Sequence, residues 1–137
     1  MTMSESAQHQ QLVRLIIEDI IGEVGPSNTA LVTTDAVDGF ALLPLTNEGF
    51  RPDVYYLFDN RMIIGEAKTS DDIDRLHSRS QYESYIKKCS LFQGSATFIM
   101  AVPWMDHATA HNIIRKIRKQ YPGDYTIKIL DGIGGAI

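Results

Sequence analysis

This chain of 137 residues has a single cysteine and no long apolar run. The one cysteine, Cys89, excludes an internal disulfide and fits a reducing compartment, so we expect a cytoplasmic protein. No apolar stretch approaches the roughly 18 residues that a membrane helix needs. Residues 1–11 are too polar for a signal peptide. The sequence therefore predicts a protein without membrane partners.

Positive charge is also scarce, because 13 Lys and Arg residues face 17 Asp and Glu residues, for a net charge of −4. This balance argues against a protein that coats nucleic acid nonspecifically, since phosphate contacts need Lys and Arg. It leaves open an enzyme that binds nucleic acid locally. The apolar fraction of 44% is ordinary for a globular protein, and residues 1–137 are expected to form a single domain.

Apolar periodicity predicts a first helix over residues 8–24, which Gly25-Pro26 ends. Asp38-Gly39 and Asp59-Asn60 are turn signals for two hairpins. Ser80 and Asp106 are expected to cap two further helices. The other expected elements are strands at 30–34, 40–45, 53–58, 61–68, 97–102 and 125–130, helices at 80–89 and 106–120, and a frayed tail at 132–137. This order predicts an α/β domain with a mixed sheet and helices on both faces.

Two carboxylates and a lysine in the middle of the chain, Asp53, Glu66 and Lys68, lie on two expected neighbouring strands. Glu66 and Lys68 share one face of their strand, and the turn at Asp59-Asn60 brings Asp53 toward them. Hard oxygen ligands favour Mg²⁺ or Mn²⁺, so Asp53 and Glu66 are the predicted metal ligands. Lys68 would orient an attacking water or stabilise negative charge. These residues suit metal-assisted hydrolysis of a phosphodiester.

Pro52-Asp53 followed by Glu66-Ala67-Lys68 resembles the signature of the PD-(D/E)XK nuclease superfamily. Gln81 and Tyr85, four residues apart on one helix face, resemble the Gln-x-x-x-Tyr motif of its RecB-type and lambda-exonuclease-type branches. The resemblance covers about residues 10–102.

This resemblance implies a restriction-endonuclease-like three-layer fold, with an α-β-β-β-α-β core followed by a C-terminal helix and strand. It implies a metal-dependent nuclease that uses Mg²⁺, with Mn²⁺ able to substitute, and it favours DNA over RNA as substrate. The implied catalytic residues are Asp53, Glu66, Lys68 and Gln81. Tyr85 is the implied substrate-binding residue, and the Ala67 carbonyl is a further candidate ligand.

Many members of the superfamily also carry an acid on the first helix. The candidates here are Glu5, Glu18, Asp19 and Glu23. At 100° per residue, Glu18 lies opposite the apolar stripe, whereas Asp19 and Glu23 flank it. Periodicity favours Glu23 but leaves the choice among these acids open.

Other polar and aromatic residues have simpler interpretations. His107 and His111 are expected on a solvated helix face, as is the basic cluster at 115–119, and packing is favoured for Trp104 over stacking on a base. Arg75, His77 and Arg79 are candidates for holding a phosphate backbone. A catalytically inactive binding or regulatory module, in a phage, mobile-element or repair assembly, is the alternative function. A homodimer, or a partner that supplies basic surface, is a further alternative.

Overall fold

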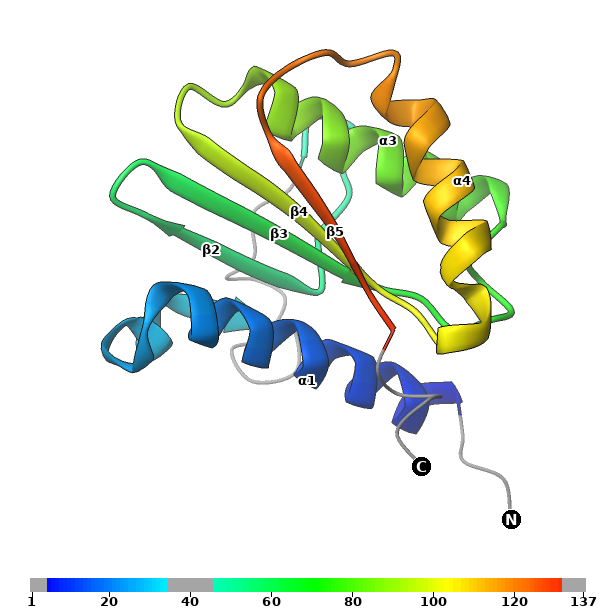
Figure 1. The fold of residues 1–137 in the computed structure, drawn as a ribbon, viewed down its shortest axis with the longest axis horizontal. Coiled ribbons are helices and arrows are strands. Elements are labelled where there is room, and N and C mark those ends of the chain that lie inside the picture. Colours follow the sequence, from blue (N-terminus) through cyan, green and yellow to red (C-terminus); the bar gives the residue numbers. More distant parts are fainter. Residues whose placement is uncertain (1–4, 35–45, 132–137) are drawn as a thin grey trace.

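The computed structural model describes residues 5–34 and 46–131 (Figure 1). The helices are α1 (Glu5–Val24), η1 (Pro26–Leu31), α3 (Leu76–Leu91), η3 (Trp104–Asp106) and α4 (His107–Arg118). The strands are β1 (Val32–Thr34), β2 (Val54–Phe58), β3 (Arg61–Ala67), β4 (Ser95–Ala101) and β5 (Thr126–Leu130). The expected strand at 40–45, the turn at Asp38-Gly39 and the tail at 132–137 lie outside the described residues.

The five strands form one mixed sheet in the order β1-β2-β3-β4-β5. β1, β2 and β3 pair antiparallel, whereas β4 and β5 each run parallel to the preceding strand. The β2–β3 hairpin turns at Asp59-Asn60, as the sequence predicts. Both turn residues have positive φ, 53° and 63°, which a tight hairpin turn requires and Asp and Asn tolerate.

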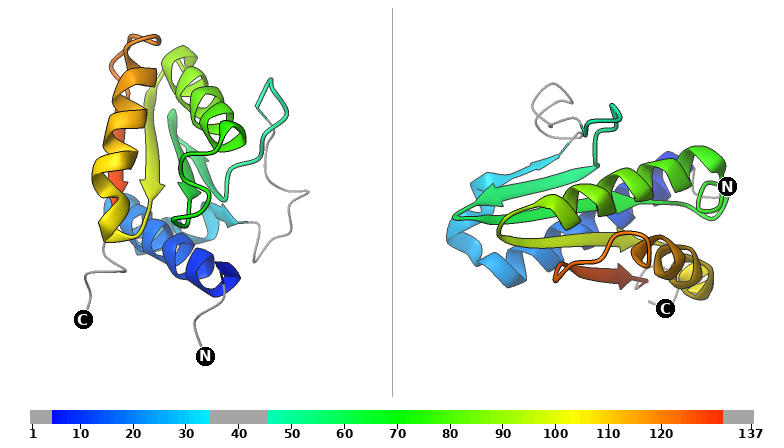
Figure 2. Two further views of the ribbon diagram at one scale, coloured as in Figure 1. Left: turned by 90° about the vertical axis from the view of Figure 1, so that its right-hand side faces the viewer. Right: turned by 90° about the horizontal axis from the view of Figure 1, so that it is seen from above.

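Helices cover both faces of the sheet, which confirms the predicted three-layer α/β arrangement (Figure 2). α1 packs on one face through buried residues that include Leu12, Ile16 and Ile20, against Ile63 of β3 and Ile99 of β4. α3 and α4 lie side by side on the other face, over Met62, Ile64 and Phe98 among others. Alternation along β3 sends its even-numbered side chains toward α3 and its odd-numbered ones toward α1.

The helix predicted to begin at Ser80 begins at Leu76, four residues earlier. Arg75 occupies the N-cap position and makes no side-chain capping bond. The Ser80 hydroxyl instead donates to the Leu76 carbonyl at 3.1 Å, four residues back within the helix. The predicted cap at Ser80 is therefore wrong, because this serine lies inside the helix and bonds to the preceding turn.

None of the helices in the described parts of the chain is both long enough and apolar enough to cross a bilayer.

Candidate functional site

The predicted metal ligands meet where β3 ends. Val54 pairs with Gly65 in the β2–β3 register, so Asp53, just before β2, lies at the same end of the hairpin as Glu66 and close enough to raise its pKa. The hairpin therefore brings the two residues to one end of the sheet, and their role as metal ligands stays a prediction.

Asp53 is held by two groups from different elements. Its Oδ2 accepts the backbone N–H of Ala67 at 2.9 Å and lies 3.1 Å from His9 Nε2. His9 belongs to the first turns of α1, and its side chain is partly exposed. His9 was not among the predicted site residues, because helical periodicity does not indicate which strand end lies beside a helix terminus.

Glu66 and Lys68 are buried charged residues, with 3% and 9% of their surface exposed. Lys68 Nζ lies 3.3 Å from Glu66 Oε2 and also donates a hydrogen bond to Gln81 Oε1. Gln81 is on α3, so the helix that follows the hairpin contacts the lysine directly. Buried charges are rare unless paired, and this lysine has both a carboxylate and an amide partner.

One oxygen of Glu66 is not satisfied by a hydrogen bond. Oε1 is buried and accepts no well-formed hydrogen bond among the described atoms, although the nearby Tyr85 hydroxyl interacts with the carboxyl group and lowers its pKa. Burial raises the pKa of Glu66 well above its usual range, and the nearby Asp53 raises it further, although Lys68 acts in the opposite direction. An unsatisfied buried carboxylate oxygen costs free energy, so its presence needs a functional or structural reason.

Tyr85 of α3, the predicted substrate-binding residue, is fully buried. Its hydroxyl donates to the carbonyl oxygen of Arg51 at 2.8 Å, which ties α3 to the segment leading into Asp53. Burial is the main cause that raises the pKa of the Tyr85 phenol. A role in substrate binding stays a prediction, and it requires the hydroxyl to exchange the Arg51 carbonyl for a phosphate oxygen.

The first-helix acids do not join this group. Lys128 on β5 lies 3.1 Å from both Asp19 and Glu23, and Arg61 lies 2.8 Å from Glu23. These ion pairs are on the α1 face of the sheet, whereas Glu66 faces α3. Glu18 is exposed, as periodicity predicts, and the side chain of Glu5 lies outside what the structure describes.

Two of the three candidate phosphate-binding residues at the start of α3 already have acid partners. Arg75 pairs with Asp72 at 3.3 Å, and Arg79 pairs with Asp74. The His77 ring packs edge-on against Phe50, with ring centroids 5.5 Å apart. Their proposed contact with a phosphate backbone stays a prediction, and for the two arginines it requires exchange of these exposed ion pairs.

Trp104 and His107 differ from the sequence-based expectations. Trp104 was expected to pack, but 54% of its surface is exposed, so that expectation is wrong. His107 is half-buried and pairs with Asp131 at 2.5 Å, whereas His111 is exposed.

The single cysteine, Cys89, is buried, and burial raises the pKa of its thiol to about 12.

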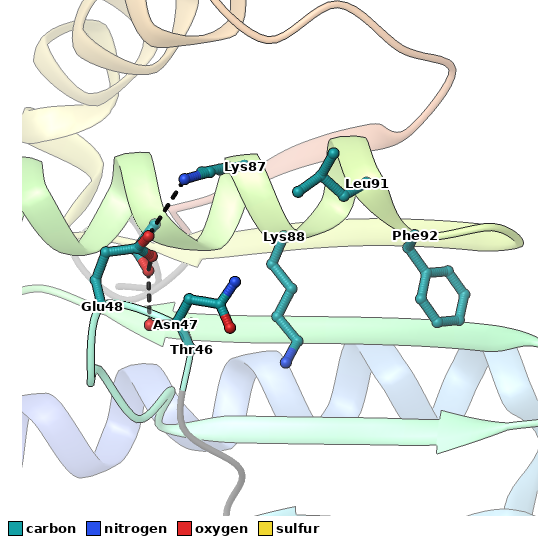
Figure 3. A pocket seen from close by; sticks show the side chains of 8 residues that line it. Thr46, Asn47, Glu48, Lys87, Lys88, Leu91 and Phe92 are labelled. Atoms are coloured by element: carbon teal, nitrogen blue, oxygen red, sulfur yellow. Dashed lines mark hydrogen bonds and ion pairs between the residues drawn. The ribbon is translucent and has the colours of Figure 1, made fainter.

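A separate surface pocket of about 270 Å³ lies along the second half of α3 (Figure 3). Ser84 donates to Glu48 Oε1 at 2.5 Å, and Lys87 lies 3.4 Å from Glu48 Oε2. The hydrogen bond from Ser84 is the main cause that lowers the pKa of Glu48. Figure 3 shows Lys88 extending across the pocket between Asn47 and Phe92. Both carboxylate oxygens of Glu48 thus have partners within the chain, unlike Oε1 of Glu66.

Within residues 5–34 and 46–131, no three His, Cys, Asp or Glu side chains converge into a group that could by itself hold a metal ion. The pair formed by Asp53 and Glu66 nevertheless fits a divalent cation in its donor chemistry. The two carboxylates supply hard oxygen ligands, and Glu66 Oε1, which accepts no well-formed hydrogen bond, is a ready acceptor. A cation would also offset the raised pKa of Glu66.

Comparison with protein-family models, with curated proteins and with solved structures found no match for this chain.

Proposed function

We propose that the chain is a metal-dependent nuclease with a restriction-endonuclease-like fold of the PD-(D/E)XK type. The observation that carries the proposal is the meeting of Asp53 and Glu66 at one end of the hairpin, with Lys68 lying 3.3 Å from Glu66 and bonded to Gln81. The element order supports it, because the described part of the chain contains a helix, three strands, a helix and a parallel strand in that sequence.

In this proposal Asp53 and Glu66 hold a Mg²⁺ ion, for which Mn²⁺ can substitute, and the Ala67 carbonyl is a further donor. His9, whose Nε2 lies 3.1 Å from Asp53 Oδ2, helps to hold that carboxylate in place from α1. The bound cation would supply Lewis-acid polarisation of the scissile phosphate and a lowered pKa for a bound water.

The protein side chains would then have distinct tasks. The Lys68 ammonium can donate to the attacking water and to the negative charge that develops on the phosphate. Gln81 fixes the position of the Lys68 ammonium by accepting one of its protons. Tyr85 holds the segment before Asp53 in place through the Arg51 carbonyl. DNA is favoured over RNA only by the resemblance.

The direct test is hydrolysis of end-labelled DNA and RNA, single-stranded and duplex, with Mg²⁺, Mn²⁺ or EDTA. Glu66→Gln keeps the size of the side chain but removes the anionic ligand, and it should abolish cleavage. Glu23→Gln is the matched control, because it removes a carboxylate from the ion pairs with Lys128 and Arg61. Equal activity in wild type and Glu66→Gln would reject the proposal.

A binding or regulatory module that has lost catalysis is the second candidate. The lack of a three-ligand group among the described residues favours it. A homodimer is also consistent with this candidate. Failure of the wild-type protein to cleave any of these substrates with either cation, together with absence of Mn²⁺ affinity, would favour the module over the nuclease.

A further inference from the structure

The last turn of α4 carries cations that lack acid partners. Arg115, Lys116 and Lys119 are exposed and form no ion pair within the described part of the chain. Most other Lys and Arg side chains lie within 3.4 Å of a carboxylate, namely Arg61, Lys68, Arg75, Arg79, Lys87 and Lys128. Because the chain has an excess of acids, this local gap leaves positive charge available to an external anion.

Of these three cations, Arg115 borders a hollow of about 270 Å³ between α4 and β5. His111, Arg115 and Arg118 line it from the helix, over an apolar floor formed by Ile127 and Ile129 of β5 among others. Arg118 is held in place: its guanidinium lies 4.5 Å from the Tyr125 ring centroid, and Nη2 donates to the Tyr125 carbonyl at 2.6 Å. A cationic rim over an apolar floor suits a ligand that has both phosphates and flat bases.

An exposed aromatic residue lies at the other end of the same helix. Trp104 and Met105, in η3 just before α4, are 54% and 64% exposed. η3 is anchored to the segment after Lys68, because Ser70 Oγ donates to Asp106 Oδ2 at 2.5 Å. The carbonyl of Ala101, three residues before Trp104, accepts the N–H of Lys68 at 3.0 Å.

Three residues span at most about 10 Å, so the backbone of Trp104 lies within this reach of Ala101, the hydrogen-bonding partner of Lys68. Figure 1 shows the ends of β3 and β4 and the first turn of α4 at the same end of the molecule. α4 itself runs away from this end for 12 residues, roughly 18 Å.

We propose that η3 and the outer face of α4 bind a single strand of nucleic acid. Trp104 stacks on an unpaired base beside the candidate site, and the phosphates that follow lie over the hollow between α4 and β5. An exposed ring combined with a cationic groove is the usual means of holding single strands, and a duplex hides the base faces that Trp104 needs. This inference extends the proposed nuclease function by specifying the strandedness of the substrate.

Trp104 is the only tryptophan, so its fluorescence reports the stacking directly. Titration with a single-stranded oligothymidylate in EDTA should quench the emission, and a blunt duplex of equal length should not. Trp104→Ala should weaken binding of a dye-labelled single strand, measured by anisotropy, by about 5- to 150-fold.

The charge contribution has its own matched pair of variants. Arg115→Gln/Lys119→Gln should reduce the slope of log affinity against log salt by about 1.4, at 0.7 per phosphate contact for single strands. Arg14→Gln/Lys88→Gln removes two cations from other surfaces, α1 and α3, and should leave the slope unchanged.

Equal quenching by the blunt duplex, absence of quenching, or equal loss in both double variants would overturn the inference. Because binding is measured in EDTA, it is independent of cleavage. Quenching without any cleavage would support single-strand binding by η3 and α4 and reject the nuclease function. Cleavage without quenching would support the nuclease function and reject this binding surface.

Discussion

Two groups of acids and lysines on opposite faces of the same sheet have very different environments. On the α1 face, Lys128 bridges Asp19 and Glu23 at 3.1 Å each, and these side chains are partly exposed. On the α3 face, Glu66 and Lys68 are buried, and one oxygen of Glu66 accepts no well-formed hydrogen bond among the described atoms.

The difference separates structural ion pairs from a candidate site. Exposed pairs contribute little to stability, typically 0–1 kcal/mol, and tolerate solvent as an alternative partner. Burial of a carboxylate disfavours its charged form, which raises its pKa and lowers the stability of the folded state when the group is ionised. Such groups are typical of functional sites, where a ligand or a reaction uses the unsatisfied atom. Removing members of each group tests this contrast.

The largest expected effect concerns the two lysines. Lys68→Met should reduce kcat for cleavage by about 10²–10³-fold, because in the proposed nuclease Lys68 is the donor to the reacting groups. Lys128→Met should leave kcat unchanged, since Lys128 lies on the other face of the sheet. Steady-state cleavage rates at saturating Mn²⁺ measure both. Similar losses in the two variants would contradict the distinction between the two groups.

A second effect tests the packing behind the site. A methyl group at Gly65 would meet Ile16 Cγ2 at 2.6 Å and Val54 Cβ at 3.2 Å. Gly65→Ala should therefore lower the free energy of unfolding by about 1–3 kcal/mol, measured by urea denaturation. Gly22→Ala, at a position with no neighbouring atom within 4 Å, is the control. A neutral Gly65→Ala would show that α1 can move away from β3.

A third prediction uses pH in the presence of EDTA. Since burial raises the pKa of Glu66, the folded state binds more protons than the unfolded state above the ordinary range of glutamate, and stability falls as pH rises there. The stability of Glu66→Gln relative to wild type should therefore increase with pH. Glu48→Gln should show the opposite trend, because the pKa of Glu48 is lowered, chiefly by Ser84. Denaturation curves at several pH values measure both, and parallel trends would contradict the assignment.

The smallest effect is expected for the exposed ion pairs. Lys128→Met should change the free energy of unfolding by about 1 kcal/mol or less, and 1 M NaCl should reduce the difference. Thermal denaturation at low and high salt measures this change. A decrease of several kcal/mol in the free energy of unfolding would contradict this expectation, because only buried ion pairs are expected to contribute that much.

The sequence was sufficient to predict the hairpin and the positions of its charged residues. Asp59-Asn60 specifies the turn, and strand alternation then places Glu66 and Lys68 on one face. The start of α3 was not predictable in this way. Its buried face includes the polar residues Ser78 and Ser84, so it lacks the apolar periodicity that marks a helix.

The residues around α1 show a second limit. Periodicity correctly places Asp19 and Glu23 beside the apolar stripe, but it cannot identify the strand residues that face them. The partners of these acids, Lys128 and Arg61, come from strands distant in sequence. For the same reason, the contact between His9 and Asp53 becomes visible only when α1 is placed across the sheet.

The central claim is that Asp53 and Glu66 form a divalent cation site. Calorimetric titration of the protein with Mn²⁺ tests it most directly, because the readout needs no substrate. We predict saturable binding by wild type and by Glu23→Gln, and loss of that binding in Glu66→Gln. Identical Mn²⁺ isotherms for wild type and Glu66→Gln would contradict the account.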